Sequence, residues 1–428
     1  MKKVLIITYY WPPVNSAGVY RWLKFVKYLR EFNWEPVVYT IERKSQEHSS
    51  GLSNDIPEGV TVLTRPIFDP FDVYQAFVRK NKKNAQPGFI NEQGTSSASR
   101  KLLFWIRGNF FIPDAKKFWI KPSIRYLCKY IQQNDIDVVV STGPPHSMHL
   151  IGHGLKKELG IKWLADFRDP WTNIDFYERL NLSKSADRKH HALERSVVSN
   201  ANEVTTVSWS LAKELGQDQG RKIHVLTNGY DEQDYQNIEQ LRSDKFTIVQ
   251  TGSMNEDRNP HALWDALNIL FSKVKGSRDS VRVKLIGSVD HFVVSSFKKA
   301  GLEDIVELHG LMAHNKAIEE MVNATLLLLP INDSKNKSGI VPGKFYEYLR
   351  SGTRVLCIGP PDGDAAKIIK ETNCGTVHDH NDVDGVFTVL ETLFKEHQTT
   401  GVTSTTANYS KYDRKNLTGE LAELLNGL

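Results

Sequence analysis

The chain has 428 residues, of which 40% are apolar, and its 55 basic and 50 acidic side chains give a net charge of +5. This length exceeds the size at which one hydrophobic core keeps growing, so we expect two domains. The three cysteines (Cys128, Cys357 and Cys374) are widely spaced and form no CxxC pair, which favours a reducing compartment and argues against a structural metal.

Short apolar runs alternate with helical patterns from end to end, which is typical of parallel α/β sheets. A first series of predicted strands covers residues 4–7, 37–39, 60–63, 138–141, 162–165, 204–207 and 224–226. The pattern then starts again, with predicted strands at residues 247–250, 281–286, 306–308, 325–329, 355–358 and 375–377. No run approaches the roughly 20 apolar residues that span a bilayer, so we expect a cytoplasmic protein, soluble or peripheral to a membrane.

The repeated series predicts two Rossmann-like, doubly wound parallel-sheet domains that face an interdomain cleft. We expect the N-terminal domain to cover residues 1–228 and the C-terminal domain residues 229–405, with a polar hinge from residue 227. A last amphipathic helix is predicted within residues 406–428, and we expect it to pack back on the N-terminal domain.

The first helix has a clear apolar face at helical spacing, formed by Val19, Trp22, Leu23, Val26, Leu29 and Phe32. Asn15 or Ser16 can cap its start. The charged residues of this segment are expected on the other side of the helix, namely Arg21, Lys24, Lys27 and Arg30.

Residues 79–125 form a basic insertion, with eleven Lys or Arg against two acids in a chain whose other residues sum to −4. Aromatic side chains are interleaved with these charges: Phe104, Trp105, Phe110, Phe111, Phe118 and Trp119. Basic residues beside interfacial aromatics suit an anionic membrane surface. The alternative is a solvated loop with some aromatics in the core. Nothing resembles a nucleic-acid-binding module, so nucleic acid is not an expected partner.

Open α/β sheets bind ligands beyond the carboxyl ends of their strands. After the strand at 138–141, a Gly-Pro-Pro turn places His146 at a helix start, where an imidazole is disfavoured as a cation and can donate to a sugar hydroxyl. The alternative is a capping or packing histidine. His149 and His153 follow at i, i+4 spacing, but without an HExxH glutamate or a third ligand, so no metal is expected.

The next predicted strand ends in Asp166, Arg168 and Asp169. Two carboxylates around an arginine at a strand end can bind a hydroxyl of the acceptor, or they can form a structural ion pair with Arg168. The residues alone leave both interpretations open.

The second domain has two candidate loops. Gly252 follows the strand at 247–250 and permits close backbone approach, and Arg258 can give phosphate a bidentate contact. Gly343 leads into a helix whose N-terminal amides suit a diphosphate, with Lys344 as an added charge and Glu347 as a buried carboxylate for a ribose. The alternative is a capped surface helix on which Lys344 and Glu347 form an ordinary i, i+3 pair.

Missing motifs exclude several enzyme classes. The first strand is not followed by GxGxxG, so a dinucleotide oxidoreductase is unexpected. Neither a GxxxxGK[ST] loop nor a GxSxG elbow occurs, which argues against a P-loop NTPase and an α/β-hydrolase.

In order along the chain, "ITYYWPPVNSAGVYR", "PPHSMHL", "ADFRDPW", "LTNGYDEQDY", "TGSMNEDRNPHALWDAL" and "GIVPGKFYEYLRSGTRVLCIG" resemble the family 4 glycosyltransferases. The resemblance implies a GT-B fold and transfer of a sugar with retention, from a nucleotide-sugar donor in the C-terminal domain to an acceptor held mainly by the N-terminal domain. It implies no metal and no other cofactor. The segment "GIVPGKFYEYL" resembles a variant pattern of bacterial polysaccharide enzymes. The expected acceptor is a saccharide or is lipid-linked, and the basic aromatic insertion fits an acceptor on a lipid carrier.

The resemblance also implies roles for single residues. Glu347 would hold the ribose, Arg258 and the loop at Gly343 and Lys344 would neutralise the diphosphate, and His146 would contact the transferred sugar. Gly18 matches the glycine loop after the first strand, and Gly310 opens the loop that lines the base. The chain departs from the pattern at Gly339, where the family's first glutamate is expected.

Two alternatives remain. A nucleotide-sugar epimerase of the same fold would need acid and base carboxylates, for which Asp166 and Asp169 are the candidates. A non-catalytic sugar-binding subunit of a polysaccharide assembly complex is compatible with the missing first glutamate.

Overall fold

The computed structural model describes residues 1–14, 16–42, 53, 55–68, 97–217, 219–236, 238–239, 244–400 and 409–428. The chain forms two compact units. The first contains Met1–Val207, Leu211–Leu226 and Thr418–Leu428, and the second contains Ser208–Ser210 and Thr227–Leu417. The main change of unit therefore lies at Thr227, where the polar hinge was predicted to start.

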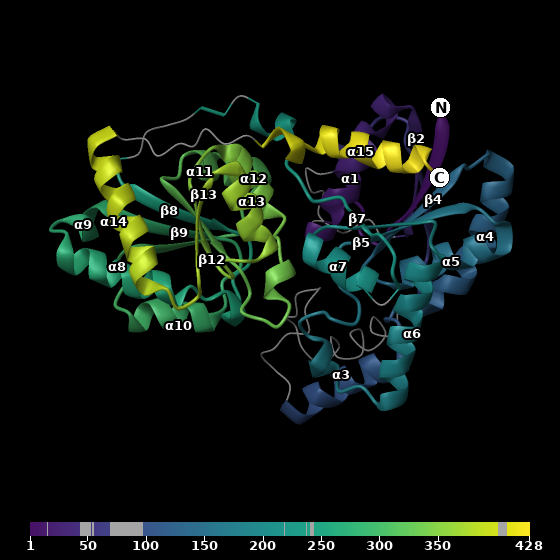
Figure 1. The fold of residues 1–428 in the computed structure, drawn as a ribbon, viewed down its shortest axis with the longest axis horizontal. Helices are drawn as coiled ribbons and strands as arrows, with labels where there is room; N and C mark the ends of the chain where they lie inside the picture. Colours follow the sequence, from purple (N-terminus) through teal and green to yellow (C-terminus); the bar gives the residue numbers. More distant parts are fainter. Residues whose placement is uncertain are drawn as a thin grey trace. The chain divides into compact units, whose positions relative to one another are not determined.

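The first unit is built on a seven-stranded sheet in the order β3-β2-β1-β4-β5-β6-β7. Figure 1 labels β2, β4, β5 and β7 of this sheet. All its paired strands are parallel. The strands are β1 (Lys2–Ile7), β2 (Trp34–Ile41), β3 (Thr61–Arg65), β4 (Val138–Gly143), β5 (Lys162–Phe167), β6 (Glu203–Thr206) and β7 (His224–Val225).

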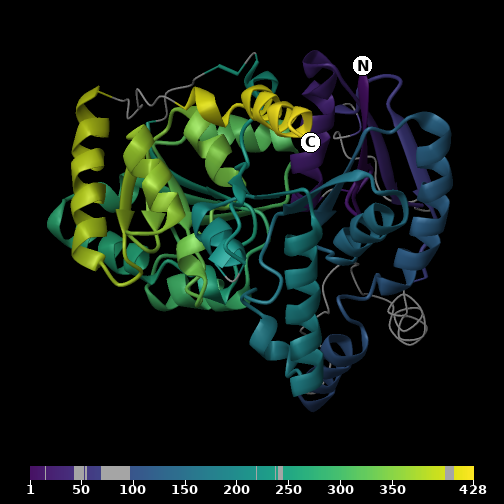
Figure 2. The same ribbon diagram turned by 45° about the vertical axis from the view of Figure 1, so that its right-hand side comes forward.

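Helices cover both faces of this sheet, since alternate residues of a buried strand point to opposite sides. Leu5 and Ile7 share one core with side chains from α4 to α7. The other face carries α1, and the last helix, yellow in Figure 2, lies on that side. A Cβ on Gly419 of this helix would come within 3.1 Å of Phe32. The helices are α1 (Ala17–Leu29), η1 (Arg30–Phe32), α3 (Ser97–Phe110), α4 (Lys117–Asn134), α5 (Ser147–Leu159), η3 (Tyr177–Leu180), α6 (Lys184–Asn200), α7 (Trp209–Gln217) and α15 (Arg414–Asn426).

Helix α1 begins where predicted, because the Ser16 hydroxyl accepts a hydrogen bond from the Gly18 amide; Asn15, the other candidate cap, lies outside the described residues. The predicted placement of its charged residues was wrong at two positions. Arg21 and Lys24 are only 2% and 3% exposed. Each has a carboxylate partner from elsewhere in the chain, Asp166 for Arg21 and Asp55 for Lys24.

The basic insertion is partly helical, and its residues 79–96 lie outside the described part of the chain. Trp119 belongs to the core and stacks on Tyr39, with ring centroids 4.8 Å apart. Phe110 and Phe118, in contrast, are 59% and 45% exposed. The core interpretation therefore holds for Trp119, whereas the membrane contact expected for exposed rings such as Phe110 and Phe118 stays a prediction. Among the described helices, none is long and apolar enough to cross a membrane.

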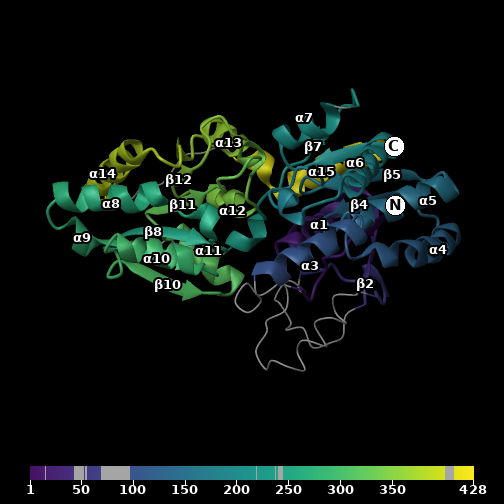
Figure 3. The same cartoon turned by 90° about the horizontal axis from the view of Figure 1, so that it is seen from below.

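The second unit is built on a six-stranded parallel sheet in the order β10-β9-β8-β11-β12-β13. Figure 3 shows β10 at its edge, beside α10 and α11. The strands are β8 (Phe246–Thr251), β9 (Val281–Ile286), β10 (Val306–Gly310), β11 (Leu326–Pro330), β12 (Val355–Ile358) and β13 (Gly375–His378).

Two apolar cores lie on the two faces of this sheet. Leu328 points into the core formed with α8, α10 and α14, while its neighbour Leu329 points into the core formed with α11, α12 and α13. The helices are η4 (Glu232–Tyr235), η5 (Glu256–Arg258), α8 (His261–Lys273), α9 (Ser277–Ser280), α10 (His291–Lys299), α11 (His314–Val322), η6 (Lys337–Gly339), α12 (Lys344–Ser351), α13 (Asp364–Thr372), α14 (Val383–Thr400) and η7 (Ser410–Tyr412).

Candidate functional site

The predicted site residues fall into one set in each unit. Gly252, Arg258, Gly310, Gly343, Lys344 and Glu347 belong to the second unit, and Gly18, His146, Asp166 and Asp169 to the first. In both sets the residues lie at the carboxyl ends of parallel strands, in the loops that follow, or in the first turn of the next helix. This is the edge at which open α/β sheets bind their ligands.

The loop after β8 requires glycine. Gly252 has φ +84° and its amide donates to the Ile286 carbonyl at 2.7 Å. The loop after β9 lies so close that a Cβ on Gly287 would come within 2.6 Å of the Gly252 carbonyl oxygen. A Cβ on Gly252 itself would meet only the side chain of Lys344, at 3.8 Å. The predicted approach of this loop to the start of α12 is thus observed.

Lys344 is the first residue of α12, and Gly343 is its N-cap. The Lys344 Nζ donates to the Thr251 carbonyl at 2.7 Å, at the end of β8. Burial, together with the nearby positive charge of Arg258, lowers the pKa of Lys344 to about 7, although Glu347 acts in the opposite sense. A lysine held against a second cation is electrostatically strained, and a bound anion relieves that strain.

Arg258 lies at the end of η5. Its Nε donates to the Asn332 amide oxygen and its Nη1 to the Ser253 carbonyl at 3.3 Å. Asn332 follows β11, the strand beside β8, and is buried. Asn332 was not predicted as a site residue, because nothing in the sequence shows that it orients Arg258.

Glu347 lies in the first turn of α12, and its carboxylate is paired with His314. The His314 Nε2 and the Glu347 Oε1 are 2.9 Å apart. The side chain of Glu347 is 23% exposed, so the expected buried carboxylate is only partly buried. The alternative of an i, i+3 ion pair is not what the structure shows, because Lys344 bonds to Thr251 instead. His314 was missed, although it follows a strand of the same sheet like the other candidates.

Gly310 is the last residue of β10 and has φ +61°, a conformation that favours glycine. It is exposed, and the next residue, Leu311, is 91% exposed. The loop is therefore open to solvent. Its expected role in lining the base stays a prediction.

In the first unit, His146 is the N-cap of α5 and is buried. Its ring stacks on Trp171, with centroids 4.6 Å apart and an interplanar angle of 6°. Burial, and to a smaller extent His149 and Arg168, lowers the pKa of His146 well below its usual range, so the ring is neutral. Its Nδ1 has no hydrogen-bond partner within the described part of the chain. His146 thus packs against Trp171, and as a neutral ring it can still donate a hydrogen bond, so the two interpretations of this histidine are compatible.

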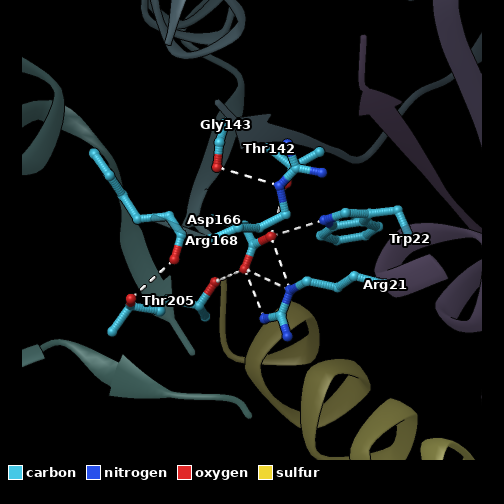
Figure 4. Close-up of polar contacts among 9 residues, drawn as sticks. Arg21, Trp22, Thr142, Gly143, Asp166, Arg168 and Thr205 are labelled. Carbon is cyan, nitrogen blue, oxygen red and sulfur yellow. Dashed lines mark hydrogen bonds and ion pairs between the residues drawn. The ribbon is translucent and has the colours of Figure 1, made fainter. Parts of the chain in front are cut away.

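Asp166 is committed to the fold, which corrects its assignment as an acceptor-binding residue. Its carboxylate lies at the centre of Figure 4 and is fully buried. It pairs with the Arg21 guanidinium at 2.8 Å and accepts further hydrogen bonds from Trp22, Thr142 and Thr205 at 2.8, 2.9 and 2.9 Å. Burial acts to raise the pKa of Asp166, but Arg21 and the other donors lower it to about 2.

The structural interpretation had assumed an ion pair between Arg168 and the neighbouring carboxylates, but Arg168 does not pair with Asp166. It donates instead to the Gly18 carbonyl at 2.6 Å, to the Gly143 carbonyl at 3.3 Å and to Pro144. Gly18 leaves the room for this contact, because a Cβ there would lie 2.8 Å from Tyr10 and 3.0 Å from Arg168. Asp169 is exposed and stays a candidate for the acceptor.

The histidines of α5 serve packing in this structure. His149 lies 3.0 Å from the Ser141 hydroxyl and stacks on Phe167, while His153 stacks on Trp163. Within the residues that the structure describes, no group of three or more His, Cys, Asp or Glu side chains could hold a metal ion.

Residues 89–234 match the family model "Glycosyltransferase Family 4". No curated protein matches the sequence.

Three solved structures illustrate the fold. A mutant of S. aureus TarM in complex with Fondaparinux, alpha-GlcNAc-glycerol and UDP has a TM-score of 0.60 at 10% identity, over 100% of both chains. The lipopolysaccharide outer core galactosyltransferase WaaB, in its apo form, gives 0.58 at 12% identity, also over 100% of both. Sucrose-phosphate synthase from Thermosynechococcus elongatus gives 0.57 at 12%, over 100% of this chain and 95% of that one. The predicted GT-B fold is confirmed, and at these identities the likeness shows the fold alone.

Proposed function

We propose that this chain, a family 4 glycosyltransferase with the GT-B fold, moves a sugar with retention from a nucleotide-sugar donor to a saccharide or lipid-linked acceptor. The setting we propose is bacterial cell-surface polysaccharide synthesis. One observation carries the donor part: Lys344 and Arg258, which are 86 positions apart in the sequence, are brought so close that each charge disfavours the other. Two cations held close together at a sheet edge suit the diphosphate of a nucleotide sugar.

The same pair suits the chemistry of transfer. When the bond from the sugar to the diphosphate breaks, negative charge grows on the leaving phosphate. Arg258, Lys344 and the N-terminal amides of α12 would stabilise that charge, which is the largest electrostatic demand of such a reaction. The proposal therefore gives no role to a metal or another cofactor, and activity should persist in the presence of EDTA.

The remaining roles follow from the family resemblance. Glu347 would accept hydrogen bonds from the ribose, and His146 would donate one to the transferred sugar. The acceptor hydroxyl would attack from the face that the diphosphate leaves, and its proton would pass to the leaving phosphate. No protein nucleophile is required, and Asp169 is the remaining candidate for holding the acceptor.

The donor site can be tested by ligand-induced stabilisation. Thermal unfolding is measured with UDP, GDP, ADP and CMP and with their sugars, because a ligand at about 100 times its Kd adds roughly 2.7 kcal/mol. We expect one nucleotide series to raise the Tm, and Glu347→Ala to abolish the shift. Glu203→Ala is the matched control, since Glu203 is also a partly exposed glutamate paired with a histidine, but in the first unit. Absence of a shift with every series would count against the donor site.

The structure disfavours the epimerase alternative. That reaction would use Asp166 and Asp169 as acid and base, and Asp166 is held as a buried anion by Arg21 and three hydrogen bonds from other side chains. Product analysis without an acceptor separates the two functions, because only an epimerase converts the nucleotide sugar to an isomer.

The exposed side of α4 supports peripheral binding to an anionic membrane. Phe118, Lys121 and Arg125 are exposed at i, i+3 and i+7, so they lie on one side of the helix. Phe118 also contacts Phe68, which is 61% exposed, with ring centroids 5.9 Å apart. Cations beside exposed aromatic rings are the features of interfacial binding. We expect the protein to sediment with vesicles that contain phosphatidylglycerol and not with pure phosphatidylcholine.

A further inference from the structure

The pair formed by His314 and Glu347 joins two helices at the candidate donor site. His314 is the first residue of α11, which follows β10, and Glu347 lies in the first turn of α12. Their side chains are 30% and 23% exposed, and the Nε2 and Oε1 atoms are 2.9 Å apart. An ionised carboxylate can only accept hydrogen bonds, so the His314 Nε2 must carry the proton.

A second contact fixes the backbone of the same glutamate. The Tyr235 hydroxyl donates to the Glu347 carbonyl at 2.7 Å. Tyr235 ends η4, and that segment is also attached to α12 through Glu232 and Arg350. The main chain of Glu347 is thus held by η4, while one oxygen of its side chain is held by α11.

We infer that His314 is a positioning residue, which orients the Glu347 carboxylate so that its Oε2 accepts the hydroxyls of the donor's ribose. This inference rests on the proposed function, because it takes Glu347 to be the ribose-binding group. A glutamate side chain has three rotatable bonds, and ordering them only on binding would weaken the affinity by roughly tenfold. In this protein the His314 hydrogen bond orders the carboxylate before the ligand arrives.

The test compares ribose with 2′-deoxyribose. The affinities of UDP, GDP, ADP and CDP, and of their 2′-deoxy forms, are measured by calorimetry for the wild type and for His314→Leu and His314→Gln. The wild type should prefer the ribose form of its nucleotide by about tenfold or more, since a missing hydroxyl leaves the carboxylate without a partner. His314→Leu should bring that ratio close to one, while the affinity for the deoxy form changes by less than about twofold.

His314→Gln distinguishes a hydrogen-bond donor from a residue that only fills space. The Gln amide nitrogen can donate from a position close to that of the imidazole Nε2, so we expect most of the ribose preference to return. His224→Leu is the matched control. His224 lies in the first unit, is 26% exposed and is 3.0 Å from Glu203. Its loss should leave the ribose preference unchanged.

The outcomes separate the inference from the proposed function. Full ribose preference in His314→Leu would overturn the inference and leave the donor site intact. Equal loss of preference in His314→Leu and His314→Gln would also overturn it, because the hydrogen bond would then not be the cause. If the wild type binds none of the four diphosphates, the donor site itself is wrong and the inference is overturned with it.

Discussion

The two units hold charged side chains at their candidate sites in opposite ways. In the first, Asp166 is fully buried, yet it is neutralised by Arg21 and further hydrogen-bonded by Trp22 and two threonines (Figure 4). In the second, Lys344 bonds to a neutral carbonyl oxygen and feels the charge of Arg258. The first arrangement lowers the pKa of its acid and the second lowers the pKa of its base, so only the first is stabilised in its charged form.

If the proposed function is correct, this difference separates a charge that supports the fold from a charge that binds a ligand. A buried ion pair with all its hydrogen-bonding groups satisfied is costly to break and has nothing left to bind a substrate. A lysine with a lowered pKa at a sheet edge is the usual sign of a functional site. Position at the carboxyl ends of the strands did not distinguish the cluster around Asp166 from the cluster around Lys344, because both lie at such an edge.

The largest effect is expected from breaking the neutralised pair. Asp166→Ala would leave the Arg21 guanidinium buried without its carboxylate, so we expect the free energy of unfolding to fall by about 3–5 kcal/mol. Chemical denaturation measures this change. Asp169→Ala is the control, because Asp169 is exposed and its loss should change stability by less than about 0.5 kcal/mol. An Asp166→Asn variant of unchanged stability but without transferase activity would restore Asp166 as a substrate-binding residue.

The next largest effect concerns catalysis. Arg258→Ala should lower kcat by about 10²–10³-fold, because it removes a positive charge from the leaving diphosphate. Stability should change by no more than about 1 kcal/mol. Arg278→Ala removes an arginine of the same unit that bonds to exposed Asp304, and it should leave kcat unaltered. An Arg258→Ala enzyme that keeps most of its turnover would contradict the assignment.

The third effect is a pH dependence that arises from Lys344. Its pKa is about 7 in the folded protein, against 10.5 for an ordinary lysine. Between these values the unfolded chain binds the extra proton, so the free energy of unfolding rises with pH across this window. A bound diphosphate favours the charged form, and its affinity should therefore fall by about tenfold per pH unit above pH 7.

Calorimetric titration of the nucleotide from pH 6 to pH 8.5 measures that slope. The same series is measured on Lys344→Met. The pH dependence that comes from protonation of the nucleotide itself is common to both proteins, so comparing the two slopes corrects for it. The wild type should lose affinity with pH more steeply than the variant. Parallel slopes for the two proteins would show that Lys344 does not meet the phosphate.

The smallest effect concerns the membrane. Lys121→Gln removes one exposed cation of α4 and should weaken binding to phosphatidylglycerol vesicles by roughly fivefold, or about 1 kcal/mol. Lys275→Gln makes the same change in net charge on an exposed turn of the second unit. Equal losses for the two variants, measured by vesicle sedimentation, would indicate a response to net charge alone and not to this surface.

The fold could be predicted because local patterns determine it. Every predicted strand corresponds to an observed one, and the strands at residues 281–286 and 355–358 have the observed bounds. Buried parallel strands are continuous apolar runs, and the helices between them show an apolar face, so short windows of sequence suffice. The family resemblance, which came from motifs spread along the chain, agrees with the glycosyltransferase family model that matches residues 89–234.

The candidate site could be predicted only in part. Lys344 and Arg258 were expected near one another because each follows a strand or begins a helix at the same sheet edge. Arg21 looked like a solvent-facing charge, since its partner Asp166 lies 145 positions away and no local pattern reveals it. His314 was missed for the same reason, because its contact with Glu347 spans 33 positions. Side chains of segments that are distant in the sequence pair only when the fold packs those segments together, so such pairs could not be predicted from local patterns.

The return of the chain to its first unit affects how the protein can be dissected. Residues 418–428 belong to the same unit as residues 1–207, although the intervening second unit is about 190 residues long. A fragment that stops at residue 226 would therefore lack Leu421 and Leu425, which are 0% and 1% exposed in the intact protein. Such a fragment is expected to aggregate, and a peptide that carries residues 414–428 should restore its solubility in trans. Linear truncation cannot separate these two units, whereas circular permutation that places the last helix before β1 can.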